Sequence, residues 1–81
     1  MFRTLVKTAT LEFSGQQAAV HYFRMVTIGR QRRFSAEVVL TPADRPTCEA
    51  ESLPAAEAWA TRLFPVMVTS RLLLNHHPEA Q

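Results

Sequence analysis

The stretch SLPAAEAWATRLFPVMVTSRLLLN, residues 52–75, decides the fold class, because its apolar residues recur at helical spacing. Ser52 is a typical N-cap residue, and Pro54 falls in the first turn, where its missing N–H costs nothing. Pro65 lies inside the run, where it removes one backbone hydrogen bond and crowds the preceding turn. The pattern therefore predicts one long helix over about residues 53–75, kinked near Pro65. Two apolar stripes run along it: Ala56, Trp59, Ala60, Leu63, Met67 and Leu74, and Phe64, Val68 and Leu72.

The residues before this stretch have the alternating pattern of β-strands. Strands are predicted at about residues 3–13, 18–28, 32–41 and 46–51, separated by the turn sequences SGQ and TPADRP and by a loop at Gly29. Strands that follow one another with short connections form an antiparallel meander. The expected fold class is α+β: a single domain over residues 1–81, with a four-stranded antiparallel sheet followed by one C-terminal helix on one face (ββββα).

The strand register decides which side chains the helix covers, because a slip of one residue moves every side chain to the opposite face. We expect an even-numbered loop at Gly29, since an odd loop would place Arg24 among apolar side chains. We expect an odd-numbered loop at residues 14–16, which leaves Lys7 as one charged misfit on the apolar face. The helix would then cover Leu5, Ala9, Leu11, Phe13, Ala19, His21, Phe23, Met25, Phe34, Ala36, Val38 and Leu40, and the open face would carry Val20, Tyr22, Arg24, Val26, Arg33 and Val39.

Composition and motifs argue against an enzyme. The chain is 47% hydrophobic and 20% charged, as expected of a globular domain, and it has no apolar run that could span a bilayer and no secretory signal, so a cytoplasmic location without a membrane partner is expected. With only two glycines it has no phosphate-binding loop, and no metal-ligand spacing occurs, so neither a cofactor nor a metal is expected. Cys48, the single cysteine, is expected to be a small buried thiol, and His21 a neutral core imidazole.

Charge is distributed unevenly along the chain. The net charge is +2, but residues 1–35 contain six basic residues against one acidic residue, and residues 36–81 contain three against six. Arg30, Arg32 and Arg33 surround the loop at Gly29, with Arg24 and Tyr22 expected beside them on the open face. Arginines neutralise phosphates, and an aromatic side chain next to them can stack on a base. These five residues are therefore the predicted nucleic-acid-binding surface.

A likeness in element order agrees with this hypothesis. Four strands leading into a kinked helix is similar to the arrangement in the transcriptional coactivators that bind single-stranded DNA as dimers. No sequence motif accompanies the likeness, so no residue role is taken from it.

Apolar surface left over by the predicted packing indicates a second chain. A homodimer is expected, most simply through the helix, because a two-fold interface lets one patch cover itself. The expected interface residues are Phe64, Val68, Leu72, Val20, Val26 and Val39. An alternative function remains open at this point, namely a protein-interaction module that docks through Val20, Tyr22, Val26 and Val39, with the arginines only keeping the hairpin soluble.

Overall fold

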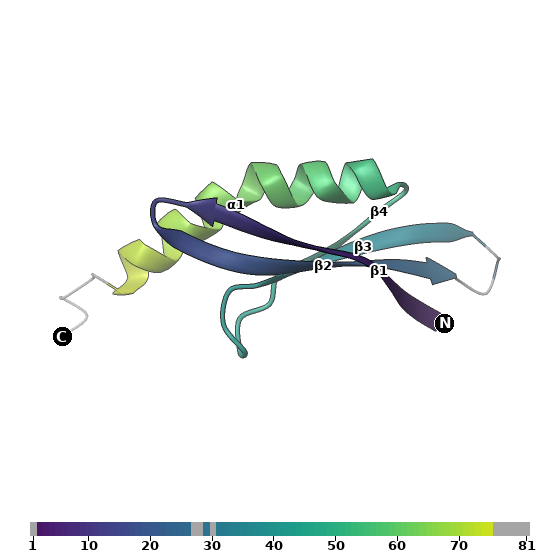
Figure 1. Ribbon diagram of the computed structural model, residues 1–81, viewed down its shortest axis with the longest axis horizontal. Coiled ribbons are helices and arrows are strands. Elements are labelled where there is room, and N and C mark those ends of the chain that lie inside the picture. Colours follow the sequence, from purple (N-terminus) through teal and green to yellow (C-terminus); the bar gives the residue numbers. More distant parts are fainter. Residues whose placement is uncertain (1, 27–28, 30, 76–81) are drawn as a thin grey trace.

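The computed structural model describes residues 2–26, 29 and 31–75 and has two layers, one sheet and one helix (Figure 1). The elements are β1 (Phe2–Phe13), β2 (Gln16–Val26), β3 (Arg32–Val39), β4 (Thr47–Ala50) and α1 (Leu53–Asn75). The four strands are antiparallel neighbours in the order β1-β2-β3-β4, and α1 lies across one face of the sheet. The predicted ββββα fold class is confirmed.

The helix begins where its capping residue predicts. The N–H of Ala55 donates to the side-chain oxygen of Ser52 at 3.2 Å, and the N–H of Ala56 donates to the Ser52 carbonyl at 3.1 Å. The first bond satisfies a donor that the first helical turn leaves without an intrahelical partner, and the second is the first i→i−4 hydrogen bond of the helix. Pro65 lies inside a helix that continues on both sides of it. The kink predicted at Pro65 stays a prediction.

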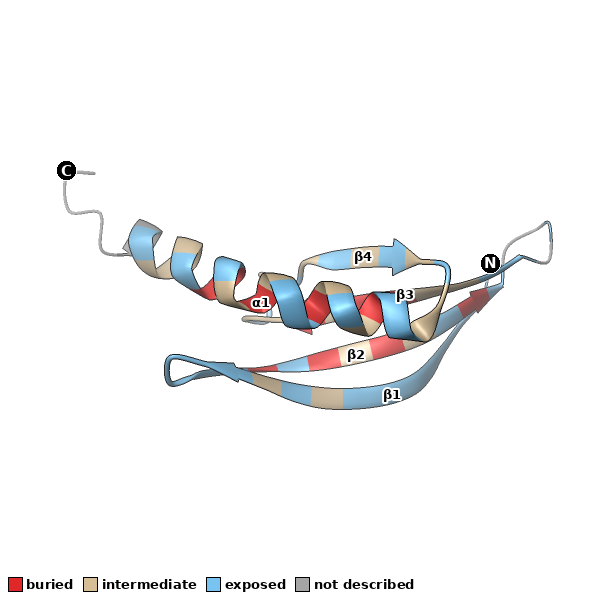
Figure 2. Ribbon diagram, turned by 90° about the horizontal axis from the view of Figure 1, so that it is seen from above, coloured by how far each residue is buried: buried red, intermediate tan, exposed pale blue. Residues whose placement is uncertain are grey.

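The hydrophobic core lies between α1 and the two middle strands (Figure 2). Val20 and Val38 are completely buried beneath the helix, where Phe64 and Val68 fill the space between the layers. Small residues contribute to this layer: Ala36 in β3 and Ala56 and Ala60 in α1 have no exposed surface, and side chains of this size allow the helix backbone to come near the sheet. Partly buried side chains surround this centre, namely Ala9, Leu11, Phe34, Leu40, Ala50, Leu53, Trp59, Leu63 and Leu72.

The register between β2 and β3 differs from the expected one. Val26 pairs with Arg32, so an odd number of residues separates the strands, and Tyr22 pairs with Ala36 on the helix side. The expected even loop is therefore wrong, and His21, Phe23 and Met25 belong to the open face instead. The physical reason is that Arg24 lies on the helix side but is exposed, so its charge is not dehydrated there.

The length of the first turn also differs from the expected one, and for part of β1 the two differences cancel, so that the same residues face the helix. Phe13 pairs with Gln16, which leaves a two-residue turn of Ser14 and Gly15 with φ angles of 55° and 79°. Positive φ at both positions is typical of a type I′ turn, whose twist matches that of the strands it joins. Because both loops have the opposite parity to the expected one, Ala9 and Leu11 still pack on the helix side, as predicted.

A β-bulge between Leu5 and Lys7 divides β1 into two parts of opposite alternation. Leu5 pairs with Phe23 and therefore belongs to the open face, contrary to expectation. Lys7 pairs with Tyr22 on the helix side, as expected, and its ammonium forms an ion pair with the Glu57 carboxylate of α1. Lys7, the one charged residue predicted on the apolar face, thus links the edge strand of the sheet to the helix.

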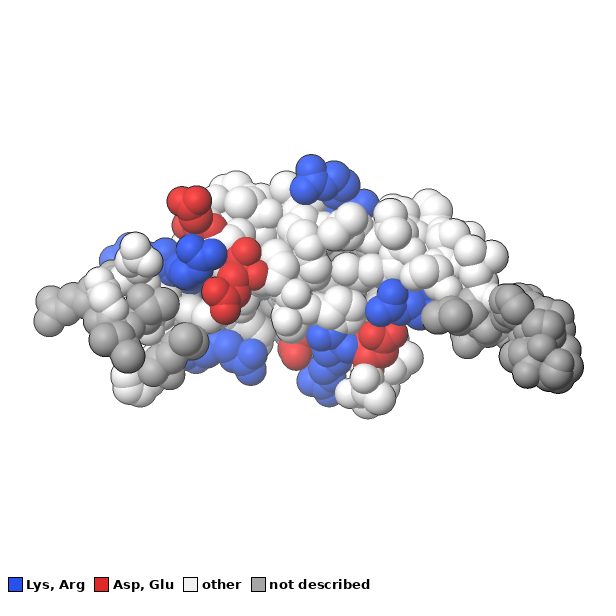
Figure 3. Space-filling view, turned by 180° about the vertical axis from the view of Figure 1, so that it is seen from behind, with Lys and Arg blue, Asp and Glu red and all other residues white. Residues whose placement is uncertain are grey.

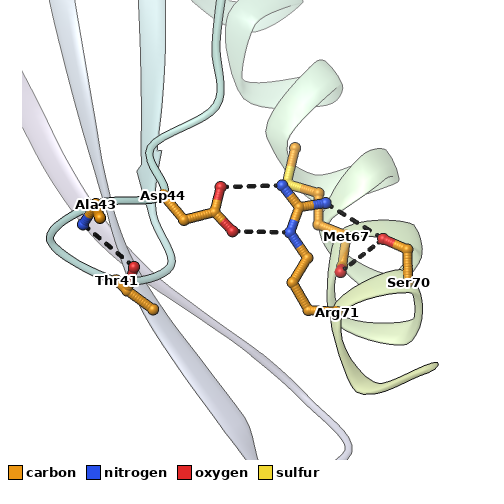
Figure 4. Close-up of polar contacts among 6 residues, drawn as sticks. All are labelled: Thr41, Ala43, Asp44, Met67, Ser70 and Arg71. Atoms are coloured by element: carbon orange, nitrogen blue, oxygen red, sulfur yellow. Dashed lines mark hydrogen bonds and ion pairs between the residues drawn. The ribbon is translucent and has the colours of Figure 1, made fainter. Parts of the chain in front are cut away.

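An ion pair fastens the last turns of α1 to the connection between β3 and β4 (Figure 4). Two guanidinium nitrogens of Arg71 donate to the two carboxylate oxygens of Asp44, at 2.9 and 3.0 Å. A third nitrogen donates to the hydroxyl of Ser70 at 3.2 Å, and this hydroxyl donates to the Met67 carbonyl at 3.1 Å. The hydrogen bonds from Arg71 hold the pKa of Asp44 below its ordinary value of 3.8.

This lowered pKa predicts a loss of stability in acid. The Asp44–Arg71 pair stabilises the fold above the unfolded-state pKa of Asp44, and this contribution disappears as the pH falls through the lower folded-state pKa. The melting temperature, measured by circular dichroism at pH values from neutral to below 3.8, should therefore fall more steeply with decreasing pH for the wild type than for Asp44→Asn. Glu51→Gln, which removes an exposed carboxylate without an ion pair in the described structure, should retain the wild-type slope. Equal slopes for the wild type and Asp44→Asn would contradict the prediction.

Candidate nucleic-acid interface at one end of the sheet

Arginines gather at the end of the sheet where β2 and β3 lead into their loop. Antiparallel pairing across β1, β2 and β3 forms three rows there: Phe2, Val26 and Arg32; Arg3, Met25 and Arg33; and Thr4, Arg24 and Phe34. These rows, which we call the basic end, contain four arginines and no acidic residue. The two-residue turn of the first hairpin is what brings the start of β1 beside the end of β2.

The four arginines extend to both sides of the sheet. Their registers place Arg24 and Arg32 on the helix side and Arg3 and Arg33 on the open side. Arg24 and Arg32 are exposed and form no ion pair within the described residues, whereas Nε of Arg33 lies 3.4 Å from a carboxylate oxygen of Glu49. Seen from behind, basic side chains lie toward this end of the molecule, with acidic side chains next to them (Figure 3). Two guanidinium groups are thus available to an anionic ligand.

Aromatic rings lie among these arginines. Phe2 is 81% exposed, which is unusual for a phenylalanine and leaves its ring open to a ligand. The guanidinium carbon of Arg3 lies 4.0 Å from the centroid of the Phe23 ring, a cation–π contact that holds both groups on the open face. The His21 ring meets Phe23 edge-on, with 6.4 Å between the ring centroids. The basic end therefore combines cationic groups with flat apolar surfaces.

Next to the basic end, the open face is hollowed and acidic. Met25 is only 6% exposed although no helix covers it, since Arg3 and Arg33 lie on either side of it and their aliphatic stems can shield it. The hollow beside Met25 has a volume of about 370 Å³, and its lining includes Glu37 and Glu49. Arg3 lines the same hollow, and a nitrogen of His21 and of Arg33 lies 3.4 Å from Glu37 and Glu49 respectively. The hollow is therefore less favourable to phosphate than the rows of the basic end, which contain no carboxylate.

The structure brings together three of the predicted binding residues and separates a fourth. Arg24, Arg32 and Arg33 lie in adjacent rows, while Arg30 lies outside the described residues. Tyr22 is 2% exposed beneath α1, where burial raises the pKa of its phenol, so the expected base-stacking tyrosine on the open face is wrong.

Sequence reasoning missed Arg3, Phe2 and Phe23. All three follow from the first-hairpin register, and the pair Ser14-Gly15 was a partial signal for it. A two-residue turn alone would place Arg3 opposite Val26, and the bulge between Leu5 and Lys7 moves it to Met25.

The histidine lies on a different face from the expected one, and the cysteine is less buried than expected. His21 is half-buried on the open face, with Nδ1 3.4 Å from a carboxylate oxygen of Glu37, so it is not a core imidazole. Cys48 pairs with Ala36 and so lies on the opposite side of the sheet from His21, and it is half-buried. Burial, and the nearby charge of Glu49, raise the pKa of the Cys48 thiol, which lowers its thiolate fraction and its reactivity.

Half of the six expected interface residues are internal. Phe64, Val68 and Val20 are at most 5% exposed and belong to the core of one chain, so they cannot form a surface between chains in this structure. Val26 is exposed and belongs to the basic end, and Leu72 and Val39 are half-buried. For Val20 the reason is again the register between β2 and β3, because the odd loop turns this residue toward the helix.

Comparisons with known proteins find no matching family, no matching curated protein and no matching solved structure. No helix among residues 2–26, 29 and 31–75 is both long enough and apolar enough to cross a membrane. Within the same residues, no group of three or more histidine, cysteine, aspartate or glutamate side chains is placed to hold a metal ion.

Proposed function

We propose that this protein is a non-catalytic binding module that binds single-stranded nucleic acid through the basic end of its sheet. The observation that carries the proposal is the concentration of four arginines in three adjacent rows without an acidic residue. Arg24 and Arg32, which have no ion-pair partner in the described structure, are the phosphate-binding residues expected to contribute most, because no internal salt bridge must be broken.

The exposed Phe2 ring favours a single strand over a duplex. Bases of a single strand can stack on Phe2, or on the Arg3 guanidinium that lies over the Phe23 ring, whereas the bases of a duplex already stack on one another. Stacking on aromatic rings tolerates any base, so the expected binding is weakly dependent on sequence and strongly dependent on salt. The alternative of a protein-docking sheet face loses support, because Val20 and Tyr22 are buried.

The proposal is tested by fluorescence anisotropy of a labelled single-stranded oligonucleotide titrated at several salt concentrations. Arg24→Ala combined with Arg32→Ala should weaken binding roughly tenfold or more and make the slope of log affinity against log salt shallower by about 0.7 for each phosphate that is no longer neutralised. Both side chains are exposed, so the melting temperature should change little.

A matched control removes the same charge elsewhere. Arg45→Ala combined with Arg62→Ala takes two exposed arginines from outside the basic end and should leave both affinity and salt slope close to those of the wild type. Absence of binding by the wild type at low salt, or equal weakening in the two double variants, would overturn the proposal.

A further inference from the structure

We propose that β1 pairs with β1 of a second copy of this chain, so that two four-stranded sheets join into one continuous antiparallel sheet of eight strands. This inference concerns the strand edge. In the dimer Phe2 and Arg3 belong to the interface, so the phosphate contacts of the basic end would rest on Arg24 and Arg32. It replaces the helix-mediated dimer that the sequence pattern suggests.

The exposed apolar side chains of the molecule gather on β1. Seven large apolar side chains are exposed among the described residues, and four of them, Phe2, Leu5, Val6 and Phe13, belong to this strand. β1 is twelve residues long and pairs with β2 on one side only, so the main-chain groups of its other side face solvent (Figure 2). A long edge strand of this kind is a template for pairing with another strand.

The opposite edge of the sheet is less suitable. β4 has only four residues, and its sequence TCEA is followed directly by Glu51, so two copies would bring Glu49 and Glu51 of each chain together. Short length and like charges are the features by which natural sheets prevent edge pairing. Of the two edges, β1 is therefore the one that accepts a second copy.

Charge complementarity selects the register of the joined strands. When the whole of β1 pairs with itself about a two-fold axis perpendicular to the sheet, Phe2 lies opposite Phe13 of the second copy and Arg3 lies opposite Glu12 of the second copy. Symmetry repeats each pair, so the register forms two phenylalanine pairs and two pairs of opposite charge. Thr4 and Leu5 lie opposite Leu11 and Thr10 in the same way.

The β-bulge is what makes this register possible. In a regular strand, residues that pair across a two-fold axis must both be odd or both be even, because only then do they point to the same face. Phe2 has an even number and Phe13 an odd one, so in a regular strand they would point to opposite faces. The bulge between Leu5 and Lys7 reverses the alternation once and brings them to the same face. As a result Phe2 and Phe13 lie on the helix side, and Arg3 and Glu12 on the open side. Residues 6–9 surround the axis without regular pairs.

Lys7 does not protect this edge. An edge lysine commonly prevents strand pairing by its charge. Here its ammonium is held by the Glu57 carboxylate above the helix side of the sheet, so its charge is compensated within the same chain.

Analytical ultracentrifugation and light scattering test the inference, because a dimer has twice the 9.2 kDa mass of the chain. The wild type should be a dimer at micromolar concentrations. Glu12→Arg places a like charge opposite Arg3 at both ends of the interface and should raise the dimer dissociation constant by tenfold or more, on the order of 1.4 kcal/mol. Arg3→Glu combined with Glu12→Arg exchanges the charges and should restore the dimer.

A variant on the helix distinguishes the other possible interface. Val66→Arg adds a charge to the exposed side of α1 and should leave the dimer intact. A monomeric wild type, dissociation by Val66→Arg but not by Glu12→Arg, or failure of the charge exchange to restore the dimer would each overturn the inference. Far-UV circular dichroism of each variant shows whether the fold is retained, and all the changed positions are exposed.

Discussion

Phe64→Ala should unfold most of the protein at temperatures where the wild type is folded. The phenylalanine is 2% exposed and lies in the middle of the only helix of the described chain, between α1 and the sheet. Replacing a buried phenylalanine by alanine typically costs about 3–5 kcal/mol, because the ring no longer packs against its neighbours and a cavity remains. A native domain is stable by only about 5–15 kcal/mol in total, and small domains lie toward the lower end. In a domain of this size we expect the melting temperature to fall by roughly 15 °C or more.

Val66→Ala, two positions along the same helix, is the control. Val66 is 60% exposed, and alanine is the better helix former, so thermal unfolding should shift by a few degrees at most. Urea unfolding gives a second measurement of the same difference. A melting temperature of Phe64→Ala within a few degrees of the wild type would show that α1 does not cover the sheet as described.

Ala60→Leu should have the second largest effect on stability, through overpacking of the core rather than through a cavity. Ala60 has no exposed surface and lies with Ala56 and Ala36 in the core between the helix and the sheet. The larger leucine side chain cannot be accommodated there unless the helix moves away, and overpacking of this kind typically costs about 1–3 kcal/mol. The helix propensities of alanine and leucine are similar, so the destabilisation can be attributed to packing.

Ala58→Leu isolates that packing contribution. Ala58 is exposed on the same helix, so the same substitution meets solvent rather than the sheet. Its urea midpoint should match the wild type, while that of Ala60→Leu should be lower. Equal midpoints for the two variants would contradict the close approach of helix and sheet.

The sequence pattern predicts the elements of this fold better than it predicts the faces of the sheet. The helix cap at Ser52 and the order of four strands and a helix follow from local chemistry, and all are found. The faces of β2 do not, because this strand is apolar on both sides and its periodicity cannot choose between them. Burial of Tyr22 rather than His21 is decided by tertiary packing and by the position of Arg24 beyond the cover of the helix.

The candidate site, too, could be predicted from the sequence only in part. The excess of positive charge in the first half of the chain correctly indicates which residues gather, because Arg24, Arg32 and Arg33 flank one loop. Arg3 is distant in sequence, and only the register of the first hairpin brings it into their neighbourhood. That register is determined by the β-bulge between Leu5 and Lys7 together with a two-residue turn in which Ser14 adopts a positive φ, a conformation uncommon for serine.

The position of α1 after all four strands has a consequence for biosynthesis. Chains leave the ribosome from their N-terminus, so the strands emerge before the helix that covers them. During that interval Val20, Tyr22 and Val38 face solvent, and the long edge of β1 is open beside them. Nascent chains in this state expose both an apolar face and unpaired main-chain groups, which are the features that chaperones bind and that lead to aggregation. Translation, rather than the folded state, is the stage at which this protein most needs protection.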